Sequence, residues 1–205
     1  MMKSSFGEFA EKISIRIGIA CSRIPISPNI WTLLSIVPAV VGFYFLTQKQ
    51  MAYAIVAFAV SAMLDAVDGG VARVTGAVTN LGAYLDGMVD RLVEALLLFG
   101  LMFYGVENWL LPGYAWIALL IFFGAVMTSY ARAYADHRKA LPEEEVKHMP
   151  GILERAERLI LVFLGMLAGA MYGPIYLTYA IALAVALSII TVAQRIWFVV
   201  KKSSS

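Results

Sequence analysis

Long apolar stretches, separated by short polar or glycine–proline breaks, dominate this chain. Each stretch has about 20 residues, the length that a helix needs to cross the hydrocarbon core of a bilayer. The pattern therefore predicts an all-α integral membrane protein with six transmembrane helices. We expect the spans at about residues 30–46, 51–72, 82–104, 114–136, 151–172 and 175–200.

The N-terminal segment has a different pattern. Phe6, Phe9, Ile13 and Ile17 recur at helical spacing, with charged residues between them. This predicts an amphipathic helix over about residues 3–22 that lies in the membrane interface. Because the apolar stretches consume nearly all of the remaining chain, residues 1–205 are expected to form a single membrane domain.

Composition supports the membrane assignment and excludes other classes. The 205 residues are 61% hydrophobic and 15% charged, which is too apolar for a water-soluble domain. A net charge of +2, without basic clusters interleaved with aromatic residues, argues against a nucleic-acid partner. Cys21 is the only cysteine, so an internal disulfide is excluded.

The lysines and arginines predict the orientation in the membrane. On the six-span count, every lysine and arginine except Lys49 falls on the side of the two termini. Cytoplasmic flanks attract Lys and Arg, whereas outer loops avoid them. We therefore expect a multi-pass protein of the cell membrane with both termini, and the active site described next, at the cytoplasmic side.

Four aspartates fall at the ends of two adjacent spans. Asp65 and Asp68 are three residues apart, and Asp86 and Asp90 are four apart, so each pair projects from one face of a helix. Carboxylates inside a membrane are costly unless something neutralises them. Since an antiparallel hairpin brings the two pairs together, they predict a site for Mg²⁺ or Mn²⁺, with room for two ions.

The residues between the two pairs suit a phosphate ester. Glycines and alanines allow a bulky group to approach the backbone, while Arg73 and Thr79 can donate to phosphate oxygens. One aspartate not fully committed to the metal can take the proton of an incoming hydroxyl group. A carboxylate-lined cation transporter is the alternative from a different class, and an aspartate-rich prenyltransferase is a further one.

The spacing of these residues is similar to a known signature. The pattern D-x-x-D-G-x-x-A-R, eight residues, then G-x-x-x-D-x-x-x-D is matched from Asp65 to Asp90. It resembles that of the CDP-alcohol phosphotransferases. The resemblance implies a six-helix homodimer in which an alcohol displaces CMP from a CDP-linked lipid. It implies that Asp65, Asp68, Asp86 and Asp90 bind metal, that Asp90 is also the base, and that Asp68, Gly69, Ala72, Arg73, Thr79 and Gly82 contact CDP.

A second basic set bears on the acceptor alcohol. Arg132, Arg155 and Arg158 fall near the cytoplasmic ends of the fourth and fifth spans, and forked guanidinium donors bind phosphate well. Alternatively, they extend to the interface or pair with Glu154, Glu157 and Asp136. The set resembles the inositol-phosphate branch of the family, although Tyr134 and Asp136 depart from its pattern. This implies inositol 1-phosphate as acceptor and CDP-diacylglycerol or CDP-archaeol as donor, with glycerol 3-phosphate as the alternative acceptor.

Overall fold

The computed structural model describes residues 18–19, 21 and 24–203. The named elements of this part of the chain are helices, and a single isolated bridge joins Trp109 to Leu111. The chain forms two compact units, of which the first ends at Leu97 and the second begins at Leu98. The predicted interfacial helix at about residues 3–22 lies almost entirely outside the described residues.

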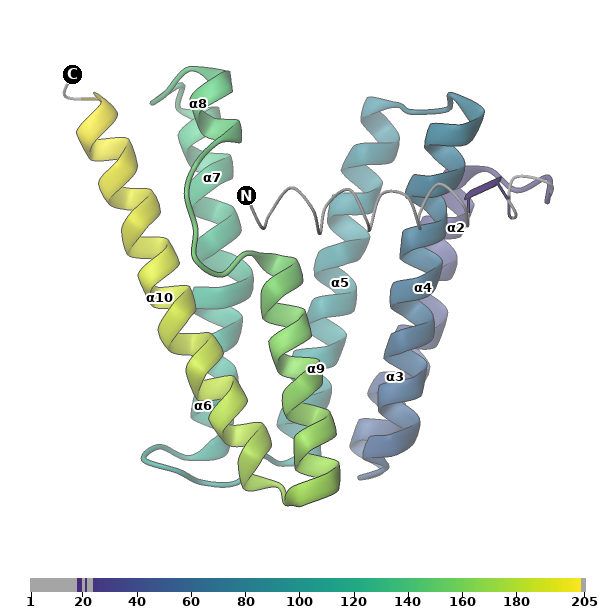
Figure 1. Ribbon diagram of the computed structural model, residues 1–205, viewed down its shortest axis with the longest axis vertical. Coiled ribbons are helices and arrows are strands. Elements are labelled where there is room, and N and C mark those ends of the chain that lie inside the picture. The colour runs from purple at the N-terminus through teal and green to yellow at the C-terminus, as the bar shows by residue number, and fades with distance from the viewer. Residues whose placement is uncertain (1–17, 20, 22–23, 204–205) are drawn as a thin grey trace. The chain divides into compact units, whose positions relative to one another are not determined.

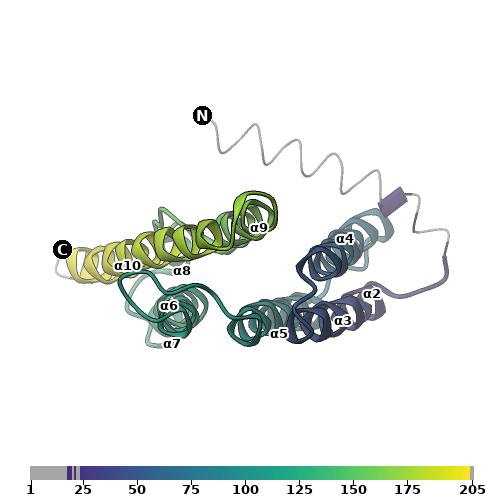
Figure 2. The same ribbon diagram turned by 90° about the horizontal axis from the view of Figure 1, so that it is seen from below.

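The first unit is built around helix α4 (Met51–Thr75). Helices α2 (Pro28–Leu34) and α3 (Ile36–Thr47) both pack against it (Figures 1 and 2). Gly42 makes part of this packing possible, because a Cβ there would lie 2.7 Å from the ring of Phe58. Helix α5 (Asn80–Tyr104) follows, and its last residues belong to the second unit.

A break at Ser35 divides the first predicted span into α2 and α3. Pro38 explains it, because proline has no N–H to donate to the carbonyl group of Leu34 four residues earlier. At the neighbouring residue, the carbonyl group of Ser35 accepts a hydrogen bond of 2.7 Å from the hydroxyl group of Ser61 on α4. The break is therefore stabilised by a contact between helices.

The second unit contains a long helix with an irregular centre. It is formed by α6 (Gly113–Leu119), the π-helix η1 (Leu120–Met127) and α7 (Thr128–His137). Helices α8 (Glu143–Lys147), α9 (Arg155–Tyr172) and α10 (Ile175–Ser203) follow. Helix α10 packs against α9 and along the long helix (Figure 1).

Four helical stretches of the described chain are long and apolar enough to cross a membrane. They are Pro28–Thr47, Met51–Thr75, Gly113–His137 and Ile175–Ser203. Helices α5 and α9 form close to where the third and fifth spans are predicted, but both carry several charged residues. An all-helical, multi-pass membrane protein is thus confirmed, while the count of six spans stays a prediction.

The predicted start of the fifth span at residue 151 is wrong by about one helical turn. Helix α9 begins at Arg155, because Glu154 and Glu157 form a capping box at its N-terminus. In this box the N–H of Glu154 donates to Oε2 of Glu157 at 2.9 Å. The residues between α8 and α9 form an irregular connector within the second unit.

Candidate functional site

A tight connection joins the two aspartate-bearing helices of the first unit. Helix α4 ends at Thr75 and is capped by Gly76, whose φ of +68° lies in the left-handed region that glycine adopts without strain. At the start of α5, the hydroxyl oxygen of Thr79 accepts a hydrogen bond of 3.0 Å from the N–H of Gly82. Thr79 therefore caps α5, and its own O–H can still donate to a ligand.

Three of the four aspartates come together at this hairpin. Asp65, Asp68 and Asp86 each offer one carboxylate oxygen, and these oxygens all lie within 4.8 Å of one another. Three converging carboxylates suit a hard divalent cation such as Mg²⁺ or Mn²⁺. Asp90 lies one helical turn beyond Asp86 and is not a member of this group.

Thr32 on α2 also takes part in the site, although it is not among the residues predicted from the sequence. Its hydroxyl group donates a hydrogen bond to Oδ2 of Asp68, and both side chains are buried, with exposed fractions of 3% and 6%. A hydrogen bond to a metal-binding carboxylate fixes its orientation. The first predicted span thus contributes to the site as well as to the membrane anchor.

A cavity of about 210 Å³ is lined by two of the three aspartates, Asp68 and Asp86. All six residues that were predicted to contact CDP line it: Asp68, Gly69, Ala72, Arg73, Thr79 and Gly82. Pro28, Asn29 and Thr32 line it from α2, and Asp86 lines it from α5. The predicted nucleotide-contacting residues therefore share one cavity next to the candidate metal site.

Two glycines keep polar groups close together in this cavity. A Cβ at Gly82 would lie 3.2 Å from both Oδ1 of Asn29 and Oγ1 of Thr79. A Cβ at Gly69 would lie 3.5 Å from a terminal nitrogen of Arg73, so the guanidinium group lies against this glycine. Amide, hydroxyl and guanidinium groups around a small cavity are suitable donors for phosphate oxygens.

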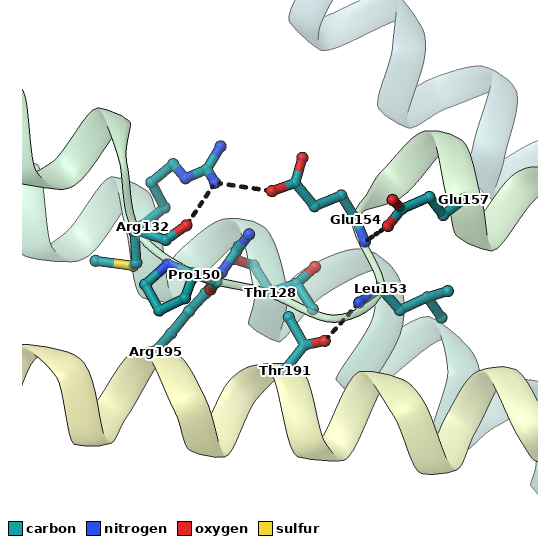
Figure 3. Close-up of polar contacts among 9 residues, drawn as sticks. Thr128, Arg132, Pro150, Leu153, Glu154, Glu157, Thr191 and Arg195 are labelled. Atoms are coloured by element: carbon teal, nitrogen blue, oxygen red, sulfur yellow. Dashed lines mark hydrogen bonds and ion pairs between the residues drawn. The ribbon is translucent and has the colours of Figure 1, made fainter. Parts of the chain in front are cut away.

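The predicted acceptor arginines belong to the second unit. A terminal nitrogen of Arg132 lies 3.7 Å from Oε1 of Glu154 and 3.5 Å from the carbonyl oxygen of Met149 (Figure 3). The ion pair with Glu154 agrees with the structural alternative considered for this arginine. Arg155 begins α9 and is half-buried, whereas Arg158, one turn further, is only 1% exposed.

A fourth arginine, Arg195 on α10, was not selected from the sequence. It is 4% exposed, and its guanidinium group donates to the carbonyl oxygens of Thr128 and Pro150. In the same region the hydroxyl group of Thr191 accepts from the N–H of Leu153 at 3.0 Å (Figure 3). An arginine within an otherwise apolar helix was the signal that could have identified it.

Comparisons with known proteins agree with this site. The family model described as CDP-alcohol phosphatidyltransferase matches residues 25–198. The archaetidylinositol phosphate synthase of Pyrococcus horikoshii is 34% identical over 183 residues, covering 89% of this chain and 88% of that protein. A protein of the same name from Aeropyrum pernix is 34% identical over 194 residues, covering 93% and 92%.

Solved structures show the same fold. The phosphatidylinositol phosphate synthase of Mycobacterium tuberculosis with CDP-DAG bound gives a TM-score of 0.78 at 24% identity, covering 92% of this chain and 94% of that one. Its complex with manganese and citrate gives 0.77 at 23% identity, covering 91% and 88%. Because the family model and the relatives of 34% identity identify the family, the alternative of a cation transporter is set aside. The chain belongs to the CDP-alcohol phosphatidyltransferase family and is a CDP-alcohol phosphotransferase of the membrane.

Proposed function

We propose that the protein transfers a phosphatidyl or archaetidyl group from a CDP-linked lipid to a hydroxyl group of inositol 1-phosphate, with release of CMP. The observation that carries the acceptor assignment is the similarity, at 34% identity over most of both chains, to archaetidylinositol phosphate synthases. The arginines of the second unit are chemically consistent with it, because a phosphorylated alcohol needs cationic donors. The donor is CDP-diacylglycerol or CDP-archaeol.

The nucleotide part of the donor is assigned to the cavity of the first unit. Asp68, Gly69, Ala72, Arg73, Thr79 and Gly82 would contact the CDP group. Arg73 and Thr79 supply cationic and hydroxyl donors, and the glycines allow the diphosphate to approach the backbone. Asn29 is added to this set, because its amide oxygen faces Gly82 across the same cavity.

The cluster of three carboxylates formed by Asp65, Asp68 and Asp86 fits a divalent cation. We assign two Mg²⁺ or Mn²⁺ ions to this cluster, and they would share its carboxylates and Asp90. The choice of metal is supported by the related M. tuberculosis protein, which was crystallised with manganese. Such ions neutralise phosphate charge and polarise the phosphorus when bound. Thr32 would hold Asp68 in the orientation that binding requires.

Asp90 is assigned as the general base. It lies on α5 one turn from Asp86, and it would serve both as a metal ligand and as the acceptor of the proton. The acceptor oxygen forms a bond to the lipid-linked phosphorus, and its proton passes to Asp90. The bond from that phosphorus to the bridging oxygen breaks, and CMP leaves with the electron pair.

Arg132, Arg155 and Arg158 are assigned to the phosphate group of the acceptor. Arg132 lies 3.7 Å from a carboxylate oxygen of Glu154, and the acceptor phosphate would take the place of this partner. Arg158 is buried, and a buried guanidinium group favours an anionic partner strongly. Inositol 1-phosphate supplies such a partner, whereas serine and free inositol bring no phosphate group.

The arrangement in the membrane is proposed on the charge distribution. Six spans in one domain place the termini and the aspartates at the cytoplasmic side, where lysine and arginine predominate. Helices α5 and α9 would be the two charged spans, with their polar faces directed away from lipid. A homodimer is expected from the family resemblance.

CMP release in liposomes tests the proposal. The purified protein is given CDP-lipid, Mn²⁺ or Mg²⁺, and one acceptor at a time: inositol 1-phosphate, glycerol 3-phosphate, serine or free inositol. We expect release with inositol 1-phosphate at a kcat/KM at least ten times that with glycerol 3-phosphate. Preference for glycerol 3-phosphate would transfer the assignment to that acceptor, and activity only with serine or free inositol would refute a phosphate-binding role for the arginines.

A further inference from the structure

The buried side chain of Arg158 lies directly against a glycine of the π-helix η1. A Cβ at Gly124 would lie 2.9 Å from Cδ of Arg158 and 3.3 Å from its Nε. Real Cβ atoms essentially never approach a neighbour as closely as the 2.9 Å to Cδ, so a larger residue at position 124 must displace Arg158. Both residues are buried, which leaves little free space for that displacement.

The backbone around Gly124 is itself held in place. The hydroxyl group of Thr128 donates a hydrogen bond to the carbonyl oxygen of Gly124. The carbonyl oxygen of Thr128 in turn accepts a hydrogen bond from Arg195. A π-helix widens the turn and is frequently found at functional sites. Two buried arginines thus contact the long helix around the end of η1, Arg158 at Gly124 and Arg195 at Thr128, the first residue of α7.

We propose that Gly124 is a positioning residue that sets the place of the Arg158 guanidinium group in the acceptor site. This inference rests on the proposed function, in which Arg158 binds the acceptor phosphate. Hydrogen bonds between guanidinium and phosphate depend on geometry, so a displaced Arg158 binds the acceptor less well. The CDP cavity is lined by residues of the first unit only, and its affinity for the donor should not change.

The test compares Gly124→Ala with Val126→Ile in the purified full-length protein. Both variants add carbon to the same π-helix, but Val126 is exposed, whereas Gly124 faces Arg158. We expect Gly124→Ala to raise the KM for inositol 1-phosphate at least tenfold and to leave the KM for CDP-lipid within twofold. Val126→Ile should change neither. Equal increases in both KM values, or no increase in either, would overturn the proposal.

A double-mutant cycle separates positioning from a general effect on folding. In an Arg158→Ala background the displaced group is gone, so Gly124→Ala should have little further effect on the acceptor KM. Effects that multiply instead would contradict action through Arg158. If Gly124→Ala does not fold, Thr128→Val is used, because it removes the hydrogen bond to Gly124 without adding an atom beside Arg158. A raised acceptor KM then supports the proposal, and an unchanged one overturns it.

The same measurements distinguish a wrong acceptor assignment from a wrong inference about Gly124. If the wild-type protein uses glycerol 3-phosphate and not inositol 1-phosphate, the proposed acceptor is wrong, and the KM comparison is repeated with glycerol 3-phosphate. A tenfold effect of Gly124→Ala on that KM would still support Gly124 as the positioning residue. If wild-type turnover with inositol 1-phosphate is normal and Gly124→Ala leaves its KM unchanged, only the inference about Gly124 fails.

Discussion

The hydroxyl group of Thr32 donates a hydrogen bond to Oδ2 of Asp68, and so connects helix α2 to the candidate metal site. The two residues are 36 positions apart and both are buried. An oxygen of a carboxylate in the candidate metal site is thus oriented by a neutral donor from another helix.

Removal of this donor should weaken metal binding. Thr32→Val keeps the shape of the side chain and removes the hydroxyl group, and loss of such a partner typically reduces metal affinity or activity about 10–100-fold. The Mn²⁺ concentration that gives half-maximal CMP release measures the effect. Thr32→Ser is the control, because it retains the donor. An unchanged Mn²⁺ requirement in Thr32→Val would show that the bond does not support metal binding.

Metal removal should abolish activity reversibly. A chelator is expected to stop CMP release, and added Mg²⁺ or Mn²⁺ should restore it. Asp86→Asn removes one charged ligand from the group of three carboxylates and should lower activity by a factor of about 100 or more at a fixed Mn²⁺ concentration. Glu144→Gln, which changes an exposed acid on α8, is the matched control. Full activity in the presence of chelator would refute the metal site.

Asp90→Asn tests the base. A general base contributes about 10²–10⁴ in rate, so CMP release should fall by that factor. The thermal midpoint in detergent should stay close to that of the wild-type protein, because the asparagine has the same shape. Turnover at the wild-type rate would remove Asp90 from this role.

Two glycine substitutions should have opposite effects on stability. Gly76→Ala places a Cβ in the left-handed region, at φ +68°, and should cost about 1–2 kcal/mol. Gly87→Ala lies within α5, where a Cβ would meet no atom within 4 Å, and should gain up to about 1 kcal/mol of helix propensity. Thermal unfolding in detergent measures both. Equal shifts of the unfolding midpoint in the two variants would contradict the argument that the left-handed backbone at position 76 favours glycine.

The ion pair at α8 gives a prediction about pH. Nζ of Lys147 lies 2.8 Å from Oε1 of Glu143, and this hydrogen bond lowers the pKa of Glu143 and raises the pKa of Lys147. Because the folded pKa of Glu143 is lowered, its stabilising contribution is present above the ordinary carboxyl pKa and is lost as pH falls through the lowered value.

An NMR titration of the Glu143 carboxyl group checks this. Lys147→Gln should raise the pKa of Glu143 towards its ordinary value, whereas Lys201→Gln, on α10, should leave it unchanged. If the Glu143 pKa in Lys147→Gln equals that in the wild-type protein, the ion pair does not form in solution.

The aspartates could be predicted because their relationship is mostly local. Spacings of three and four residues place side chains on one face of any helix, and a short connection brings two such faces together. Asn29 and Thr32 could not be found in this way. Their position in the cavity depends on how α2 packs against α4, and a threonine in an apolar helix carries no signal of its own.

The π-helix could not be predicted from the sequence either. The long helix was predicted at about 114–136 and runs from Gly113 to His137, so its limits were nearly right. Its central residues, LIFFGAVM, are all apolar or glycine, and no polar residue marks the helical phase there. Such a pattern does not distinguish α from π geometry, and it does not indicate the contact between Gly124 and Arg158.

The break at Ser35 separates α2, which lines the cavity, from α3, which forms the rest of the first predicted span. Bilayers of different thickness change the tilt of a spanning helix. Because Ser35 is tied to Ser61 on α4 and Pro38 interrupts the backbone hydrogen bonding, tilting of α3 need not be transmitted to α2. The cavity that Pro28, Asn29 and Thr32 line from α2 would then keep its shape in thin and thick membranes alike.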